Sequence, residues 1–177
     1  MSFTDAKHLD IEKVPVIDIS KLCDDTDPLP VAKALHKAST GLGFIYIKGH
    51  GIPKDIINSL REEGLTFFRN NDRNKEEVKI TEKHRGWLGY GGAKMEDNAK
   101  ADLKESFLWG YQDKNGASLN NHPLRGNNIW PSFQPNLEKT SMEYFNYADE
   151  LARNLMRGFA LGLDLEKNFF LKTCENP

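Results

Sequence analysis

Residues 43–53 read GFIYIKGHGIP, and this stretch decides the fold class that the sequence predicts. It begins with an apolar run that is too short for a helix and is rich in residues that favour strands. Two further glycines and Pro53 then close it, as at a turn. The stretch therefore predicts a buried strand that ends in a tight turn.

The segments on its N-terminal side predict a strand and a helix. Residues 14–19 (VPVIDI) alternate apolar and polar side chains, which is the period of a strand. Over residues 31–42 the apolar side chains recur at helical spacing, and Pro28 suits the first turn of that helix. Gly41 or Gly43 would end it. A strand, a helix and a second strand in this order indicate an α/β fold.

The C-terminal side predicts two more helices and a two-stranded ribbon. Residues 53–67 place apolar side chains on one helical face. Residues 85–92 (RGWLGYGG) and 102–111 (DLKESFLWGY) have the composition of strands. Residues 112–128 are rich in Asn and Gly and predict an irregular segment, before the longest helix at about 135–163.

The longest predicted helix carries an apolar stripe that we expect to pack against the sheet. The stripe includes Phe145, Leu151, Leu155 and Phe159. Bulky apolar residues also follow the helix, and few positions remain to cover them: Leu165, Phe169, Phe170 and Leu171. Because folded domains rarely leave apolar faces and strand edges open, this ending predicts that a further part of the protein is missing from the chain.

The composition excludes several classes of function. The 177 residues carry 24 Lys and Arg against 26 Asp and Glu, a net charge of -2, with a pI near 6.2 and a mean hydropathy of -0.61. No surplus of cations is available for nucleic acid or an anionic membrane. The two cysteines, Cys23 and Cys174, form no metal or disulfide motif. These features predict a cytoplasmic protein that acts on a small molecule or binds another protein.

Short motifs give few positive signals. The sequence has no GxxxxGK[ST], GxGxxG, HExxH or GxSxG pattern. His8 and Asp10 satisfy HxD, which is two thirds of the ligand set of a non-haem iron triad. The pair lies in a polar tail that would not hold ligands rigid, so we expect neither residue to bind metal. His50, between two glycines, is expected to be a packed and hydrogen-bonded residue rather than a catalytic base.

Glu105 is the most distinctive acid in the chain. Strict alternation places it on one strand face among apolar and aromatic residues, namely Leu103, Phe107, Trp109 and Tyr111. A buried carboxylate needs a partner, and we predict that Arg85 on the neighbouring strand supplies it. An active-site acid with a raised pKa is the alternative. The aromatics Trp87, Trp109 and Tyr111 are expected in the core, because no basic groove accompanies them for stacking on bases.

Several stretches, taken in order, resemble a known family. VPVIDIS, GFIYIKGHGIP, RGWLGYGG, DLKESFLWG, NNIWP and GLDLEKNFF follow the order and approximate spacing of the N-terminal region of isopenicillin N synthase-like 2-oxoglutarate and Fe(II)-dependent dioxygenases. The resemblance runs from about Val14 to the end. It implies an α/β cap of helices on a few short strands, which belongs to a jelly-roll (double-stranded β-helix) oxygenase whose barrel is mostly absent from this chain.

The resemblance also implies a division of the chain and of the chemistry. Residues 1–13 would be a polar tail, 14–128 the cap region, and 129–177 a long helix that leads to the missing jelly roll. The complete enzyme would use Fe(II) and 2-oxoglutarate to oxidise a small organic substrate, although some relatives dispense with 2-oxoglutarate. The family's HxD, distant His and RxS are expected in the jelly roll. We therefore expect no catalytic residue, no metal ligand and no specific cofactor in this chain.

In the family, the segment that matches residues 84–90 can reach the substrate pocket from the side of the cap. Arg85, Leu88 and Tyr90 are therefore the candidate substrate-binding residues, and packing within the cap is the alternative interpretation. The substrate class stays open among amino acids, peptides, terpenoids and phenolics. A stand-alone binding or interaction module that kept the cap and lost the barrel is the second hypothesis for the whole chain.

Overall fold

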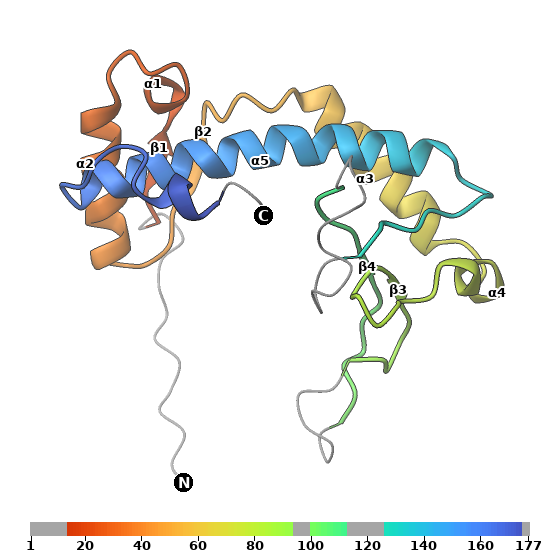
Figure 1. The fold of residues 1–177 in the computed structure, drawn as a ribbon. Helices are drawn as coiled ribbons and strands as arrows, with labels where there is room; N and C mark the ends of the chain where they lie inside the picture. Colours follow the sequence, from red (N-terminus) through yellow and green to blue (C-terminus); the bar gives the residue numbers. More distant parts are fainter. Residues whose placement is uncertain (1–13, 94–99, 113–125, 175–177) are drawn as a thin grey trace, which may run out of the picture. The chain divides into compact units, whose positions relative to one another are not determined.

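The computed structural model describes residues 14–93, 100–112 and 126–174. Contacts divide the chain into two compact units, one made of the residues up to Ile52 and from Tyr147 onward, the other of Pro53–Asn146. The elements in chain order (Figure 1) are β1 (Val16–Asp18), α1 (Ser20–Cys23), α2 (Pro28–Thr40), β2 (Tyr46–Lys48), α3 (Lys54–Phe68), α4 (Asp72–Lys75), η2 (Glu76–Val78), β3 (Gly86–Leu88), β4 (Ser106–Leu108), α5 (Asn136–Gly162) and η3 (Phe170–Thr173).

The first unit contains the predicted strand, helix and strand. β1 and β2 pair in parallel, with Ile17 opposite Ile47, and α2 lies between them in the sequence. The predicted helix is confirmed: α2 starts at Pro28 and ends before Gly41. Parallel pairing requires such a crossover connection, which explains why the helix separates the two strands.

The first unit has an apolar core. Its buried members are Ile17, Ile19, Leu22, Val31, Leu35 and Ala38, and Leu151, Leu155 and Phe159 of α5 pack against them. Because α5 supplies the last three residues from more than 100 positions along the chain, this helix covers the core that the first strands and α2 leave open. The predicted packing is thus confirmed for Leu151, Leu155 and Phe159, whereas Phe145, the fourth residue of the predicted face, is not among the residues packed against this core.

The prediction of a buried second strand is wrong. Phe44 and Tyr46 are 72% and 54% exposed, whereas Ile45 and Ile47 contact the core. A sheet of two strands has one face on the core of its unit, so alternate residues of β2 point outward. The apolar run in the sequence reflects two different environments rather than burial on both faces.

The turn after β2 depends on its glycines. Gly49 and Gly51 have φ angles of 69° and 77°, in the left-handed region that favours glycine. A Cβ at Gly49 would also lie 2.6 Å from a carboxylate oxygen of Asp18. Between them, Nδ1 of His50 accepts a hydrogen bond from the backbone N–H of Ile52 at 3.1 Å. His50 is therefore a hydrogen-bonded turn residue, as predicted.

The second unit contains the predicted ribbon. β3 and β4 are antiparallel, with Trp87 opposite Phe107, but each spans only three residues. The buried core around them consists of Phe67, Val78, Trp87 and Leu137, with Phe68, Phe107, Ile129, Trp130 and Phe133 packed against it. Of the aromatics that we predicted to be buried, Tyr111 is 43% exposed, so that prediction is wrong. Leu103, on the face predicted to be apolar, is 93% exposed.

The long helix is confirmed almost to its ends, since α5 runs over Asn136–Gly162 where residues 135–163 were predicted. Leu137, near the start of α5, is 3% exposed and lies in the core of the second unit.

After the end of α5, the side chain of Phe169 is 48% exposed, and the ring of Phe170 packs edge-on against the ring of Phe169 with 5.3 Å between the ring centres. The predicted polar tail and most of the predicted irregular segment at 112–128 lie outside the described residues.

Candidate functional site

Glu105 lies at the centre of a buried polar cluster in the second unit. Its Oε2 accepts a hydrogen bond from Nζ of Lys75 and another from Nε1 of Trp87, both at 2.7 Å. The Lys75 side chain is 2% exposed and that of Glu105 is 11% exposed. Lys75 Nζ also contacts Asp72 at 3.0 Å and donates to the backbone oxygen of Phe68. The carboxylate is thus held by a cation and an indole rather than left for catalysis.

Lys75 keeps its charge in spite of its burial. Burial by itself would lower the pKa of the ammonium group, but the hydrogen bonds to Glu105 and Asp72 outweigh it, so the pKa of Lys75 lies above its usual value. The Lys75 ammonium also lies 5.0 Å from the centre of the Trp87 ring, which adds a cation–π contact. The cluster therefore holds Lys75 as a cation.

Arg85 is not the partner of Glu105, contrary to the prediction. Because Trp87 stands opposite Phe107 in an antiparallel ladder, Arg85 lies beyond Phe107 in the direction of Gly110, whereas Glu105 lies on the other side. A Cβ built at Gly110 would stand 2.7 Å from Nη2 of Arg85, which locates the guanidinium there. Sequence patterns did not point to Lys75, because it stands in the polar stretch NNDRNKEEVK and resembles a surface residue.

The positive charge of the Arg85 guanidinium is only weakly compensated by neighbouring groups. Its Nη1 donates to the backbone oxygen of His84 at 3.1 Å, and its buried Nε has no hydrogen-bond partner among the described residues. Within the same part of the chain, no carboxylate forms an ion pair with Arg85. Burial lowers the pKa of this guanidinium from its usual value. A half-buried cation with a free donor is suited to receive an anionic group.

The other two predicted substrate-binding residues lie further along the same segment. Leu88 is half-buried and stands opposite Ser106, and Tyr90 is 66% exposed in the turn that follows β3. Arg85, Leu88 and Tyr90 therefore share one short segment, but none of them lines the cavities described for residues 53–146. Their role in substrate binding stays a prediction.

The described residues do not form a metal site. Within 14–93, 100–112 and 126–174, no group of three or more His, Cys, Asp or Glu side chains is placed to hold a metal ion. These ranges therefore do not fit an iron site. His8 and Asp10 lie outside the described residues, so the prediction that they bind no metal stays a prediction.

Among the described helices, none is both long and apolar enough to cross a membrane.

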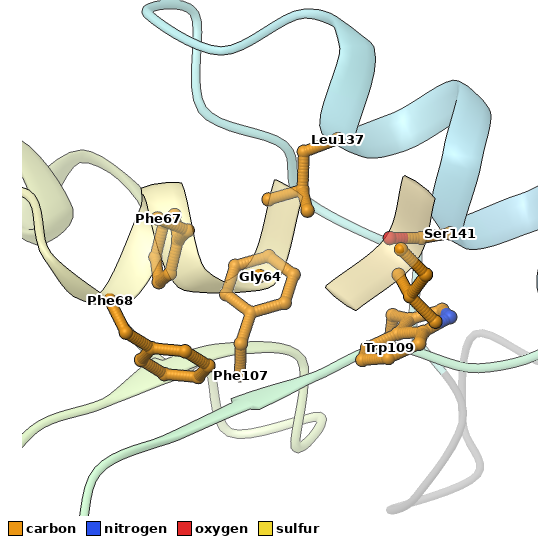
Figure 2. Close-up of a pocket in the computed structure, with 8 residues that line it drawn as sticks. Gly64, Phe67, Phe68, Phe107, Trp109, Leu137 and Ser141 are labelled. Atoms are coloured by element: carbon orange, nitrogen blue, oxygen red, sulfur yellow. The ribbon is translucent and has the colours of Figure 1, made fainter. Parts of the chain in front are cut away.

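An apolar cavity of about 110 Å³ lies in the second unit, and the sequence did not predict it. Figure 2 shows aromatic rings on two of its sides, with α5 on a third. Three segments line it. They are α3 with Leu60, Gly64, Phe67 and Phe68, the region of β4 with Phe107 and the adjacent Trp109, and α5 with Leu137 and Ser141. Nε1 of Trp109 and Oγ of Ser141 are buried and have no hydrogen-bond partner among the described residues.

Residues 14–133 match the family model described as "non-haem dioxygenase in morphine synthesis N-terminal". Among curated proteins, homoarginine-6-hydroxylase from Glycine max is 31% identical over 174 residues, which are 91% of this chain and 52% of that protein. A 1-aminocyclopropane-1-carboxylate oxidase from Dictyostelium mucoroides is 28% identical over 175 residues, 93% of this chain and 46% of that protein. The chain thus spans about half the length of these relatives.

Solved structures show the same relationship. The crystal structure of a full-length Neurospora crassa protein in complex with alpha-KG matches with a TM-score of 0.72 and 30% identity, over 89% of this chain and 49% of that one. A putative 2OG-Fe(II) oxygenase family protein from Caulobacter crescentus shares the fold, with a TM-score of 0.77 at 20% identity. The family match over residues 14–133, together with these structures, shows that the chain belongs to the family of N-terminal regions of non-haem 2-oxoglutarate and Fe(II)-dependent oxygenases.

Proposed function

We propose that this chain is the N-terminal cap of an oxygenase that uses Fe(II) and 2-oxoglutarate to oxidise a small organic substrate. The observation that carries the proposal is the family match over residues 14–133, in a chain that spans about half of its relatives. In this proposal the iron and the cosubstrate are held by the remaining, jelly-roll part of the protein. The cap then acts as a wall of the substrate pocket and contributes no metal ligand.

The cap contacts the substrate through Arg85, Leu88 and Tyr90. The half-buried Arg85 guanidinium has a free Nε–H and no ion-pair partner in the described part of the chain, which supports a role in binding an anionic group of the substrate. One relative is an oxidase of 1-aminocyclopropane-1-carboxylate, whose name includes such a group. Leu88 and Tyr90 supply apolar and aromatic surface next to it. A small carboxylic acid is the substrate class that this arrangement favours.

The composition supports a proposal about the cellular location and the binding partners of the chain. A net charge of -2 provides no attraction for nucleic acid or an anionic membrane, and we propose a cytoplasmic protein. The second candidate function is a stand-alone binding module derived from the cap. Phe44, Tyr46 and Phe169, all exposed apolar residues of the first unit, favour such a module only if another protein covers them.

The reading frame beyond Pro177 distinguishes the two candidates. A continuation that contains HxD, a distant His and RxS supports the oxygenase, and a stop codon at that point supports the module. The extended protein should bind Fe(II) in an anaerobic calorimetric titration and form succinate from 2-oxoglutarate. The 177-residue chain should do neither, and a stoichiometric Fe(II) site lost on His8→Ala or Asp10→Ala would contradict the proposal.

The role of Arg85 is tested separately in the extended protein. Arg85→Gln should raise KM for a carboxylate substrate at least tenfold and leave KM for 2-oxoglutarate unchanged. Arg61→Gln is the matched control, because Arg61 is 70% exposed and pairs with Glu62 alone among the described residues. Equal KM values for Arg85→Gln and the unsubstituted enzyme would remove Arg85 from the substrate site without affecting the assignment as an oxygenase.

A further inference from the structure

We propose that the cavity lined by α3, Phe107, Trp109 and the first turns of α5 is a binding site for a small neutral aromatic molecule that carries one hydroxyl group, of the size of phenol. The cavity lies within residues 53–146, and none of Arg85, Leu88 or Tyr90 lines it. The site is therefore separate from the proposed substrate site, and the proposal does not depend on the oxygenase activity.

The size and the lining of the cavity select an aromatic ligand. Its volume of about 110 Å³ is below the roughly 150 Å³ of a closed apolar cavity that binds benzene, but this cavity is partly open to solvent, so a single ring can enter it with part of the ring left exposed. Phe67 and Phe107 meet edge to face at 4.8 Å beside it, which leaves ring faces and edges available to a further ring. None of the described residues that line the cavity is charged, so a neutral ligand is favoured over a carboxylate or an amine.

Gly64 creates the space. It lies inside α3, where glycine is less favourable than alanine, and a Cβ built on it would meet no atom within 4 Å. The helix could therefore accept a side chain at this position without a clash. Gly64 is one of the residues that line the cavity, and in Figure 2 it overlaps the ring of Phe107. The glycine keeps open a volume that almost any other residue would fill.

Two buried polar atoms next to the cavity select the hydroxyl group. Ser141 is 1% exposed, and its Oγ has no hydrogen-bond partner in the described part of the chain. Figure 2 shows this hydroxyl turned away from α5 toward the cavity. Nε1 of Trp109 is likewise buried and unpartnered within the described residues. Because buried polar groups are nearly always hydrogen-bonded, a ligand hydroxyl that accepts from Trp109 and donates to Ser141 would satisfy groups that the protein leaves unsatisfied.

Titration of the 177-residue chain with phenol and with benzene tests the site. The readout is the indole N–H resonance of Trp109 in a nitrogen–proton correlation spectrum, which changes when a ring enters the cavity. We expect phenol to bind at least tenfold more tightly than benzene. Ser141→Ala should weaken phenol about tenfold and leave benzene unchanged, because it removes only the hydrogen bond.

Filling the cavity gives the second test. Gly64→Leu should abolish the binding of both probes, whereas Thr66→Leu, which adds the same side chain at an exposed position of α3, should leave both affinities unchanged. Unchanged phenol affinity in Gly64→Leu would overturn the proposal, as would the absence of binding by either probe. If Gly64→Leu does not fold, contacts between phenol protons and the ring of Phe107 in the unsubstituted chain decide the question, and contacts confined to other residues would overturn it.

Discussion

Nζ of Lys75 lies 2.7 Å from Oε2 of Glu105, although 30 positions separate the two residues in the sequence. The ammonium group is almost fully buried, and the carboxylate also accepts from Nε1 of Trp87. This contact ties the short helix α4 to the residue that precedes β4. It fixes the β3–β4 ribbon, and with it the segment that carries Arg85, to the rest of the second unit.

Glu105→Ala should destabilise the chain strongly. Removing Glu105 leaves the buried Lys75 with only the exposed Asp72 as a carboxylate partner and leaves the Trp87 N–H without its acceptor, so the expected loss in the free energy of unfolding lies at the lower end of the range for broken buried pairs, about 3 kcal/mol. The control is Glu76→Ala, since Glu76 pairs with Lys79 at the surface, where both side chains are more than half exposed. That pair should contribute about 0–1 kcal/mol. Urea denaturation of both variants checks the prediction, and equal losses would contradict it.

The same pair predicts a loss of stability at high pH. Burial lowers the folded-state pKa of Lys75, but Glu105 and Asp72 outweigh burial and raise it above its usual value of 10.5. Its contribution is therefore complete below pH 10.5 and disappears as the pH rises through the higher, folded-state pKa. The difference in unfolding free energy between the unsubstituted chain and Lys75→Met, measured from about pH 8 to about pH 11.5, should stay constant up to about pH 10 and shrink above it. A constant difference over this range would show that Lys75 is not held as a charged group.

Sequence patterns predicted the elements of the fold well and their surroundings less well. α2, α3 and α5 follow from apolar periodicity, because each covers a core along one face, and a proline stands at or just before the first residue of each helix. The predicted buried strand failed at Phe44 and Tyr46, because a short apolar run does not reveal how many of its faces another element covers. Burial depends on contacts that the local sequence does not contain.

The candidate site shows the same limit. The prediction that Glu105 requires a partner is confirmed, whereas the alternation along residues 102–111 was wrong for Leu103 and Tyr111, which are exposed. The choice of Arg85 failed, because the register of β3 on β4 places Arg85 away from Glu105, and the local sequence does not determine that register. The cavity beside Trp109 arises from three separate segments, and only Gly64, a glycine inside a helix, marks it in the sequence.

Leu155→Ala should lower the melting temperature. Leu155 packs against the core of the first unit together with Leu151 and Phe159, and large-to-small changes at such positions cost about 2–5 kcal/mol. A value near 2 kcal/mol is expected because Leu155 is only partly buried. Leu163→Ala is the control, as that residue is 51% exposed, and it should change stability by less than about 0.5 kcal/mol. Thermal unfolding followed by circular dichroism measures both, and an unchanged melting temperature for Leu155→Ala would show that the core face of α5 is assigned wrongly.

Glycine-to-alanine substitutions in α3 and in α5 should change the free energy of unfolding in opposite directions. Gly64→Ala should raise the free energy of unfolding by about 0.5–1 kcal/mol, because it removes a helix-interior glycine and its new Cβ meets no atom within 4 Å. Gly162→Ala should lower it by about 1–3 kcal/mol, because its Cβ would lie 2.8 Å from the backbone oxygen of Ala32, and α2 would have to move away. Chemical denaturation distinguishes the two signs directly. Stabilisation by both substitutions would mean that α2 does not approach the end of α5 closely, whereas destabilisation by Gly64→Ala would mean that the space beside Phe67 and Trp109 is already occupied.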